Sequence, residues 1–282
     1  MTTHHKSAQE ENFPVAFCLF PKQYRRLVEV YYRFAREADD IADAPDLTNQ
    51  KKLAKLAEMA DGLYGKSTQA KSAVKLREMF LHEGFDFALA GDLLKAFEQD
   101  ANGFEYRTWA QLIAYCRNSA APVGRFLLAM YGENPSTYLP AEALCAALQI
   151  VNHVQDMHSD ACKLKRCYMP QEILQKYGAA EADICGAKMP KGLRLAADDV
   201  LDRCEGLLKD AAQLPKIMVA KVLRIEVFVI IYLTKRLIYK LKKYDCLQRK
   251  VKLSTWDRGL ALVAGVVQGL CLKPNVERTD LR

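Results

Sequence analysis

Helical periodicity along nearly the whole chain is the feature of this sequence that most restricts its fold. Apolar residues recur at helical spacing, as in the stripe formed by Val30, Phe34, Ala38 and Ile41. Segments with the strict alternation of a half-buried strand are few. Half of the 282 residues are hydrophobic, which is enough to build a substantial core. The sequence therefore predicts an all-α protein, a bundle of helices joined by short loops.

Prolines and capping residues mark where the helices are expected to begin and end. The first long helix opens at Pro21 and stops at Ala44-Pro45-Asp46, because the residue before a proline disfavours the helical conformation. Asp92 and Thr108 are expected N-caps. Later helices are expected at about 48–64, 69–83, 92–103, 108–119, 122–131, 140–160, 170–177, 191–213, 216–244 and 254–271.

No linker or internal repeat divides the chain. We therefore expect a single domain over residues 1–282, with short polar tails at about 1–11 and 273–282. The stretch from 178 to 190 contains glycines and a proline and is expected to be irregular.

The charge of the chain narrows the classes of partner. The formal net charge is +7, and basic residues concentrate in KRLIYKLKKYDCLQRKVK, residues 235–252. Leu237, Ile238 and Leu241 are spaced to lie on one packed face of this basic helix, and its lysines lie on the other faces. A solvated helix face is the ordinary interpretation, and contact with a membrane surface is the main alternative. Nucleic acid is not an expected partner, because no recognisable binding motif accompanies the charge.

The N-terminal residues, the longest apolar run and the cysteines indicate the cellular location of the protein. Residues 1–13 are polar and lack the apolar core of a secretory signal. The longest apolar run, 259–272, is shorter than the roughly 20 residues of a spanning helix. The nine cysteines form no CxxC motif, which favours reduced thiols over a zinc site. We expect a cytoplasmic protein, and peripheral contact with the inner face of the membrane stays open.

Two clusters of aspartate at helical spacing carry the strongest functional signal. The first contains Asp39, Asp40 and Asp43; the second contains Asp156 and Asp160, and Asn152 extends it by one turn. Residues four apart share a helix face, so the first and last aspartates of each cluster point together. Stacked carboxylates repel each other unless they share a hard cation, and Mg²⁺ is usually held by one or two carboxylates plus substrate phosphates. The clusters therefore indicate an enzyme that handles a diphosphate.

Each cluster has a simpler interpretation when it is taken alone. An exposed acidic face would explain one cluster, but the first lies at the C-terminal side of its helix, where negative charge is unfavourable. Arg33 and Arg36 precede the first cluster, and Lys163, Lys165 and Arg166 follow the second. Guanidinium groups bind phosphate oxygens, so the bases and carboxylates together predict a diphosphate clamp. Surface ion pairing is an equally simple role for any one base.

Departure of the diphosphate would leave a carbocation on the substrate. Such a cation needs a water-poor cavity with aromatic rings, whose faces attract positive charge. The candidates are Phe13, Phe17, Tyr24, Tyr31, Tyr32, Phe34, Tyr115 and Tyr168. Most of this group is expected to be ordinary core packing.

The residues around both clusters resemble the squalene and phytoene synthase family. The first motif reads YYRFAREADDIAD, and the second reads NHVQDMHSD, followed by an arginine and Tyr-Met-Pro. The segment YCRNSAAPVGRFLL, residues 115–128, is similar to a further helix of the family, and the likeness runs from Asn12 to Lys252. The opening ENFPVAFCLFPK and the Asn-Ser-Ala-x-Pro-Val-Gly form look closest to one subgroup, the hydroxysqualene synthases of bacterial hopanoid biosynthesis.

The resemblance implies a type I isoprenoid synthase fold, a helical bundle around a deep central cavity. It implies Mg²⁺ bound by Asp39, Asp40, Asp43, Asp156 and Asp160, diphosphate contacts from Tyr32, Arg36 and Arg166, and catalytic positions at Tyr115, Tyr168 and Asn152. Asp40 is rotated by roughly 100° from Asp39 on a helix, so it is the weakest of the five predicted metal ligands. Tyr232 and Arg249 match late family positions by their offset alone.

The chain departs from the family pattern in three places. Asn12 replaces a serine that several relatives carry near the N-terminus. The usual Gly-Arg-x-Tyr-Leu-Pro reads KRCYMP, residues 165–170, so Lys165 replaces the glycine. His158 and Ser159 fill the middle of the second motif, where many relatives carry an acidic residue. These changes leave the predicted metal ligands intact.

The subgroup resemblance implies Mg²⁺-dependent conversion of presqualene diphosphate and water to hydroxysqualene and diphosphate, a lyase reaction. No Gly-rich dinucleotide fingerprint is present, which agrees with capture by water rather than hydride. One alternative is a head-to-head prenyl transferase that joins two farnesyl diphosphates to presqualene diphosphate, squalene or a carotenoid precursor. Another is a non-catalytic assembly protein of the same fold, and a third is a lipid-binding protein that uses the basic helix.

Overall fold

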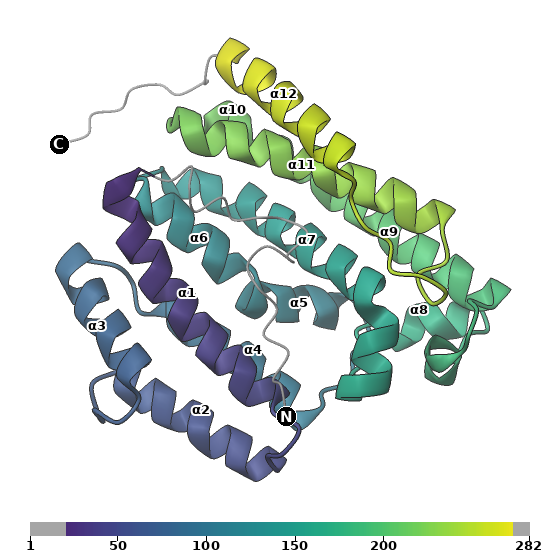
Figure 1. Ribbon diagram of the computed structural model, residues 1–282, viewed down its shortest axis with the longest axis horizontal. Helices are drawn as coiled ribbons and strands as arrows, with labels where there is room; N and C mark the ends of the chain where they lie inside the picture. Colours follow the sequence, from purple (N-terminus) through teal and green to yellow (C-terminus); the bar gives the residue numbers. More distant parts are fainter. Residues whose placement is uncertain (1–20, 273–282) are drawn as a thin grey trace.

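The computed structural model describes residues 21–272, and every regular element in this range is helical (Figure 1). The all-α prediction is therefore confirmed for this part of the chain. The α-helices are α1 (Lys22–Asp43), α2 (Asn49–Leu63), α3 (Lys71–Glu83), α4 (Ala88–Asn102), α5 (Trp109–Ser119), α6 (Ala121–Met130), α7 (Tyr138–Ser159), α8 (Gln171–Lys176), α9 (Lys191–Ala211), α10 (Leu214–Ile217), α11 (Lys221–Lys243) and α12 (Thr255–Cys271).

The core consists of two hydrophobic clusters that meet at α4 and α6. One cluster joins α1, α2 and α3 to parts of α4 and α6. The larger cluster surrounds α7 and takes in α5, α8, α9 and α11, together with the remaining faces of α4 and α6. Figure 1 shows α1, α2 and α3 on one side of the molecule and α9, α11 and α12 on the other, with α7 between them. None of the helices between residues 21 and 272 is long and apolar enough to cross a membrane.

Aromatic packing fixes the rotation of α1, the helix that carries the first aspartate cluster. The ring of Tyr31 stacks on Phe126 of α6, with centroids 4.1 Å apart and planes within 5°. The Tyr31 hydroxyl donates to the carbonyl oxygen of Leu89 at 2.6 Å, so this buried polar group is satisfied. Phe34, one turn further on, is fully buried. Both aromatic residues belong to the core, as expected for most of the aromatic candidates.

Most helix boundaries agree with the predicted ones to within two or three residues, and two do not. Thr108 is the N-cap of α5 and forms a capping box with Gln111, as predicted. Asp92 is not an N-cap, because α4 begins at Ala88, where Asp86 accepts the backbone N–H at 2.8 Å. The expected helix over 140–160 begins at Tyr138 and passes into a π-helical turn at Asp160. A short 3-10 helix, Glu181–Cys185, lies within the stretch expected to be irregular.

The single helix expected at 216–244 is wrong, because the structure divides it into α10 and α11. The break lies at Met218, Val219 and Ala220. The carboxylate of Glu133, which is buried, accepts the backbone N–H of Val219 at 3.0 Å and that of Ala220 at 2.6 Å. These amides begin α11, and a carboxylate at a helix N-terminus is stabilised by the helix dipole. The partner that ends one helix and starts the next is far away in sequence, so local periodicity does not indicate it.

Candidate active site

The first acid row, Asp39 and Asp43, lies on the last two turns of α1. The apolar stripe that precedes it is buried, and this burial turns the row toward the bundle. The pKa of Asp39 is raised to about 7, chiefly by burial and then by the nearby charge of Asp43, against the opposing charge of Arg36. The two carboxylates therefore repel each other, which is the situation that a shared cation relieves.

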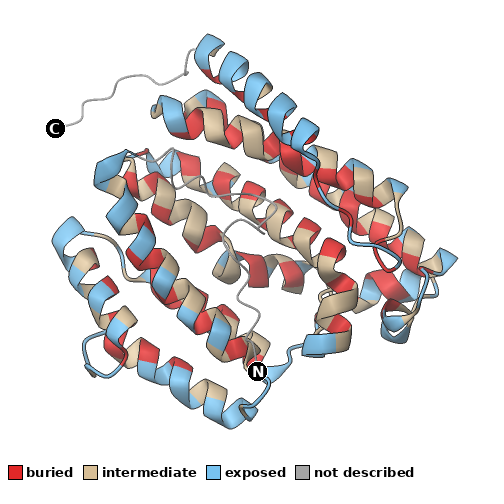
Figure 2. Cartoon of the chain, in the orientation of Figure 1, coloured by how far each residue is buried: buried red, intermediate tan, exposed pale blue. Residues whose placement is uncertain are grey.

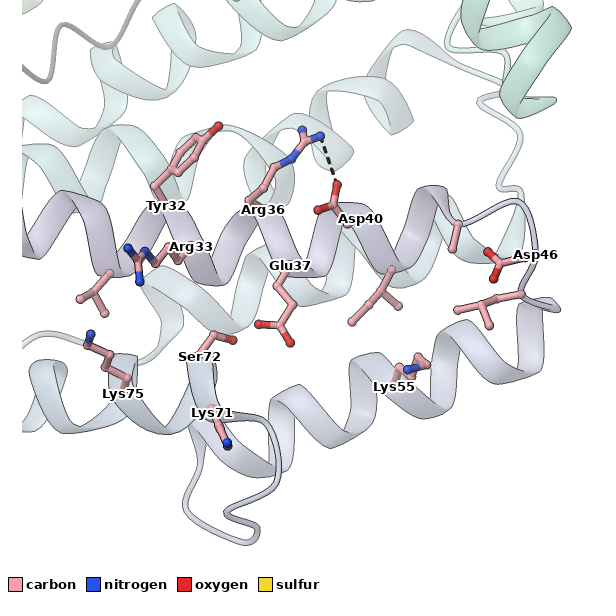
Figure 3. A pocket seen from close by; sticks show the side chains of 14 residues that line it. Tyr32, Arg33, Arg36, Glu37, Asp40, Asp46, Lys55, Lys71, Ser72 and Lys75 are labelled. Carbon is pink, nitrogen blue, oxygen red and sulfur yellow. Dashed lines mark ion pairs between the residues drawn. The ribbon is translucent and has the colours of Figure 1, made fainter. Parts of the chain in front are cut away.

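Asp40 lies on a different side of α1 from the first acid row. Its carboxylate is 3.1 Å from Arg36, whose other nitrogen donates to Asp39 at 2.9 Å. Asp40 lines a groove of about 740 Å³ between α1, α2 and α3, and Figure 3 shows its carboxylate pointing toward Arg36. Tyr32 lines the same groove, together with Lys55. Asp40 thus lines a groove that Asp39 and Asp43 do not line, as its helical rotation predicted. Arg36 nevertheless contacts both Asp39 and Asp40.

The second acid row, Asp156 and Asp160, lies at the C-terminal end of α7. Asn152, Asp156 and Asp160 are all half-buried, and Asp160 is the first residue of the π-helical turn that follows α7. Lys250 lies 3.3 Å from the Asp156 carboxylate, and His153 lies 3.9 Å from Asp160. π-helical turns occur frequently at functional sites, and this one turns the chain from the second acid row to Arg166.

Arg166 connects the end of the second acid row to a carboxylate of the first. Its backbone N–H donates to the carbonyl oxygen of Asp160 at 3.1 Å, while its guanidinium donates to the Asp43 carboxylate at 2.6 Å. The same guanidinium donates to the carbonyl oxygens of Ala42 at 2.8 Å and Asp100 at 3.2 Å. Its positive charge lies at the C-terminus of α1, where the helix dipole favours cations. The sequence predicted Arg166 as a phosphate contact, and here its described partners are the acid row and two main-chain carbonyls.

Asp100 is a half-buried acid that the sequence analysis did not single out. It accepts the hydroxyls of Tyr115 and Tyr168, each at 2.8 Å, and so joins two of the predicted catalytic residues. Burial raises the pKa of Asp100, and the nearby charge of Arg166 opposes that shift. The ring of Tyr168 stacks on His153, with centroids 3.6 Å apart. Asp100 is a lone aspartate near the end of α4, and no motif or repeated spacing marks it in the sequence.

The Tyr115 and Tyr168 hydroxyls are neutral over the ordinary pH range. Burial raises the pKa of both side chains well above the usual range for tyrosine, and the charge of Asp100 raises both further. The two rings lie 5.6 Å apart and are fixed by their common bond to one carboxylate. The pair therefore presents two immobilised aromatic rings beside the acid rows.

Lys165 adopts the left-handed backbone conformation, with φ of 57°. It is the only residue other than glycine with positive φ between residues 21 and 272. The family pattern has glycine at this position, and glycine adopts this conformation without steric cost. The departure noted in the sequence thus falls where the chain must turn sharply to aim Arg166 at Asp43.

The carboxylates suit Mg²⁺ by their oxygen chemistry and by their charge. Between residues 21 and 272, no three His, Cys, Asp or Glu side chains are grouped closely enough to hold a metal on their own. A pair of acids in each row is compatible with Mg²⁺, since this ion takes one or two carboxylates and completes its octahedron with phosphate oxygens and water. The repulsion between the neighbouring, half-buried carboxylates of Asp39 and Asp43 is the structural observation that favours a cation there.

An apolar cavity of about 150 Å³ lies deeper in the bundle, between α6, α7, α10 and α11. Its walls are aliphatic, for example Leu127, Leu144 and Leu223, and Glu226 is its single charged residue. Burial raises the pKa of Glu226 to about 7. Tyr232 is half-buried on α11, and Arg249 stacks on the ring of Tyr244 at 4.1 Å, so neither is linked to the acid rows by a described contact. Phe13, Phe17 and Asn12 lie outside the described residues.

Comparison with known proteins gives a consistent result for sequence and structure. Residues 6–257 match the family model for squalene/phytoene synthases. The chain is 37% identical over 262 residues to the hydroxysqualene synthase of Zymomonas mobilis subsp. mobilis, covering 92% of this chain and 88% of that protein. Among solved structures, a dehydrosqualene synthase in complex with ligand has a TM-score of 0.77 at 22% identity, covering 90% of each chain. The squalene synthase HpnC from Alicyclobacillus acidocaldarius has a TM-score of 0.72 at 26% identity, covering 84% of this chain and 90% of that one.

Proposed function

The chain belongs to the squalene/phytoene synthase family, and we propose that it converts presqualene diphosphate and water to hydroxysqualene and diphosphate. The observation that carries the proposal is the junction at Arg166, which binds the Asp43 carboxylate of the first acid row and the main chain at Asp160, beside two fixed tyrosine rings. The choice of substrate and product is supported by the similarity to a hydroxysqualene synthase over most of both chains.

In this proposal, the acid rows bind the diphosphate end of the substrate through Mg²⁺. Mg²⁺ held by the two rows would neutralise the diphosphate as it leaves. Arg36 and Arg166 lie directly against the rows, so their guanidinium groups are positioned to exchange a carboxylate partner for a phosphate oxygen.

The tyrosines act on the carbon skeleton. When the bond between carbon and the diphosphate oxygen breaks, its electron pair leaves with the diphosphate and a cyclopropylcarbinyl cation remains. The faces of Tyr115 and Tyr168 stabilise this cation while it rearranges, and Asp100 holds both rings in place. A water oxygen then forms the new bond to carbon, and its surplus proton passes to solvent. Asn152, on the helix of the second acid row, would orient the departing group.

Product analysis tests the proposal. Presqualene diphosphate and Mg²⁺ should yield hydroxysqualene, identified by mass spectrometry, in equal amounts with and without NADPH. Formation of product from farnesyl diphosphate alone would show that the substrate assignment is wrong. In that case a head-to-head prenyl transferase, suggested by the likeness to the squalene synthase HpnC, becomes the better description.

Two substitutions test whether the acid rows bind Mg²⁺. Asp43→Ala and Asp156→Ala should each abolish diphosphate release while the circular dichroism spectrum stays helical. Asp46→Ala is the matched control, because Asp46 is exposed and lies beyond the end of α1. Full activity in the first two variants would defeat the metal assignment, whereas an unmodified chain that releases no diphosphate would favour a non-catalytic protein of the same fold.

A further inference from the structure

The outward-facing side of α12 is apolar, which reverses the usual arrangement of a surface helix. Its large side chains Trp256, Leu260, Val263, Val267 and Leu270 follow helical spacing and are all exposed, from 52% for Leu260 to 78% for Trp256. We call these five residues the outer face of α12. A surface helix normally turns such a stripe toward the core. Figure 2 shows this side of α12 as exposed along its length.

The inward-facing side of α12 is built from small residues. Ala261, Gly265 and Gly269 are buried against α11, on which α12 chiefly packs. A side chain at Gly265 would overlap Val229, and one at Gly269 would overlap Ile225. Small residues at this spacing let two helix backbones approach closely, so α12 is held to α11 without its large apolar side chains. Those side chains are therefore free to contact something outside the chain.

The charges of residues 221–271 indicate which kind of surface the outer face contacts. Residues 221–271 contain eleven Lys and Arg and three Asp and Glu, an excess of eight that exceeds the excess of seven in the whole chain. Five of the exposed bases that form neither an ion pair with a described residue nor the ring stacking of Arg249 are Lys221, Lys235, Lys243, Lys252 and Arg258. None of the three acids is exposed, and Asp257 is buried in ion pairs with Arg236 and Lys240.

We propose that α12 docks on an anionic lipid bilayer, with its outer face inserted among the acyl chains and the five exposed bases at the headgroups. An apolar stripe flanked by basic residues is the pattern of a helix that lies in the membrane interface. Its 17 residues span about 25 Å, which suits a helix lying along the surface. A second copy of the chain fits less well, because a symmetric contact through α12 would bring two strongly basic surfaces together.

This assignment places the inserted apolar face on α12, whereas the alternative in the sequence analysis placed the membrane contact on residues 235–252, which here supply only Lys235, Lys243 and Lys252 as headgroup contacts. Helix α11 ends at Lys243, so those residues do not form one helix. Several of their bases are occupied within the protein: Lys242 pairs with Asp202 and Lys250 with Asp156. The inference does not rest on the proposed reaction, because it concerns a surface formed by α11, α12 and the segment that joins them.

Vesicle flotation of the full chain tests the proposal. The protein should float with vesicles of phosphatidylcholine and phosphatidylglycerol, and much less with phosphatidylcholine alone or at high salt. The variant V263E/V267E should lower the partition coefficient for the anionic vesicles by about tenfold or more, because it places two carboxylates in the apolar stripe. Leu81→Glu on α3 is the matched control, since Leu81 is also exposed, at 57%, and should leave binding unchanged.

Two further readouts separate docking from misfolding and from dimerisation. In a Trp109→Phe background, Trp256 is the remaining tryptophan, and its emission should shift to shorter wavelength when anionic vesicles are added. Turnover of detergent-dispersed substrate by V263E/V267E should equal that of the unmodified chain. The proposal is overturned if the unmodified chain does not float, if V263E/V267E floats equally well, or if lipid-free protein forms a stable dimer that this double substitution dissolves.

Discussion

Arg166 should be one of the more important single side chains for the stability of this fold outside its apolar core. Replacing it with methionine removes three hydrogen bonds, to the Asp43 carboxylate at 2.6 Å and to the carbonyl oxygens of Ala42 and Asp100. Hydrogen bonds to charged groups contribute roughly 1.5–3 kcal/mol each. The guanidinium is 11% exposed and Asp43 is 38% exposed, so solvent screens part of the ion pair.

After this discount, we expect Arg166→Met to lower the free energy of unfolding by about 3 kcal/mol. For a chain of this size, that loss lowers the melting temperature by about 6–12 °C. Urea denaturation followed by circular dichroism measures the first quantity, and differential scanning fluorimetry measures the second.

A second arginine in the same protein provides the control. Arg33 forms an ion pair with Glu29 at the same distance, 2.6 Å, but the two side chains are 65% and 56% exposed. Exposed pairs contribute little, so Arg33→Met should change the free energy of unfolding by less than about 1 kcal/mol. If both variants lose the same stability, the importance given to the junction at Arg166 is wrong.

Three further substitutions test individual features of the structure. Lys165→Gly should raise the free energy of unfolding by about 1 kcal/mol, since glycine adopts a φ of 57° without strain; a loss of stability in urea would contradict the left-handed turn. Asp100→Asn should lower turnover about tenfold with the fold retained, because the charged acceptor of the Tyr115 and Tyr168 hydroxyls is replaced by a neutral one; an unchanged rate would remove Asp100 from the site. Glu226→Gln should stabilise the protein by up to about 3 kcal/mol at pH 8 and hardly at all near pH 4, as measured by urea denaturation at both values.

The direction of the Glu226 effect follows from its raised pKa. The folded state holds the proton up to about pH 7, whereas the unfolded chain releases it near the ordinary value of 4.5. Stability of the unmodified protein therefore falls as the pH rises between these two values, and the loss is complete above about pH 7. Glutamine does not titrate, so the extra stability of Glu226→Gln should develop as the pH rises between these two pKa values. Equal extra stability at pH 4 and pH 8 would contradict the raised pKa of Glu226.

Local sequence signals were enough to predict most of the helices. Thr108 with Gln111, and Pro170 before α8, act within a few residues of the boundary that they set, and periodicity locates the rest. The break between α10 and α11 could not be predicted in this way, because Glu133 lies on another part of the chain. Where a distant side chain binds main-chain amides, tertiary structure overrides a continuous helical pattern.

The acid rows were predictable because repeated spacing places like charges on one face. That spacing also separated Asp40 from Asp39 and Asp43, in agreement with its position on the groove between α1, α2 and α3. Asp100 was missed, because a single aspartate becomes informative only when two tyrosine hydroxyls are seen to converge on it. The outer face of α12 was missed for a related reason, since an apolar run does not reveal which of its sides is buried.

The central claim is that this site ionises a prenyl diphosphate and delivers water to the resulting cation. The most direct test is to incubate the protein with presqualene diphosphate and Mg²⁺ in water labelled with heavy oxygen, and to analyse the organic product by mass spectrometry. We predict hydroxysqualene that carries the heavy isotope, together with Mg²⁺-dependent release of unlabelled diphosphate. Squalene formed only when NADPH is present, or an alcohol without the label, would contradict the account.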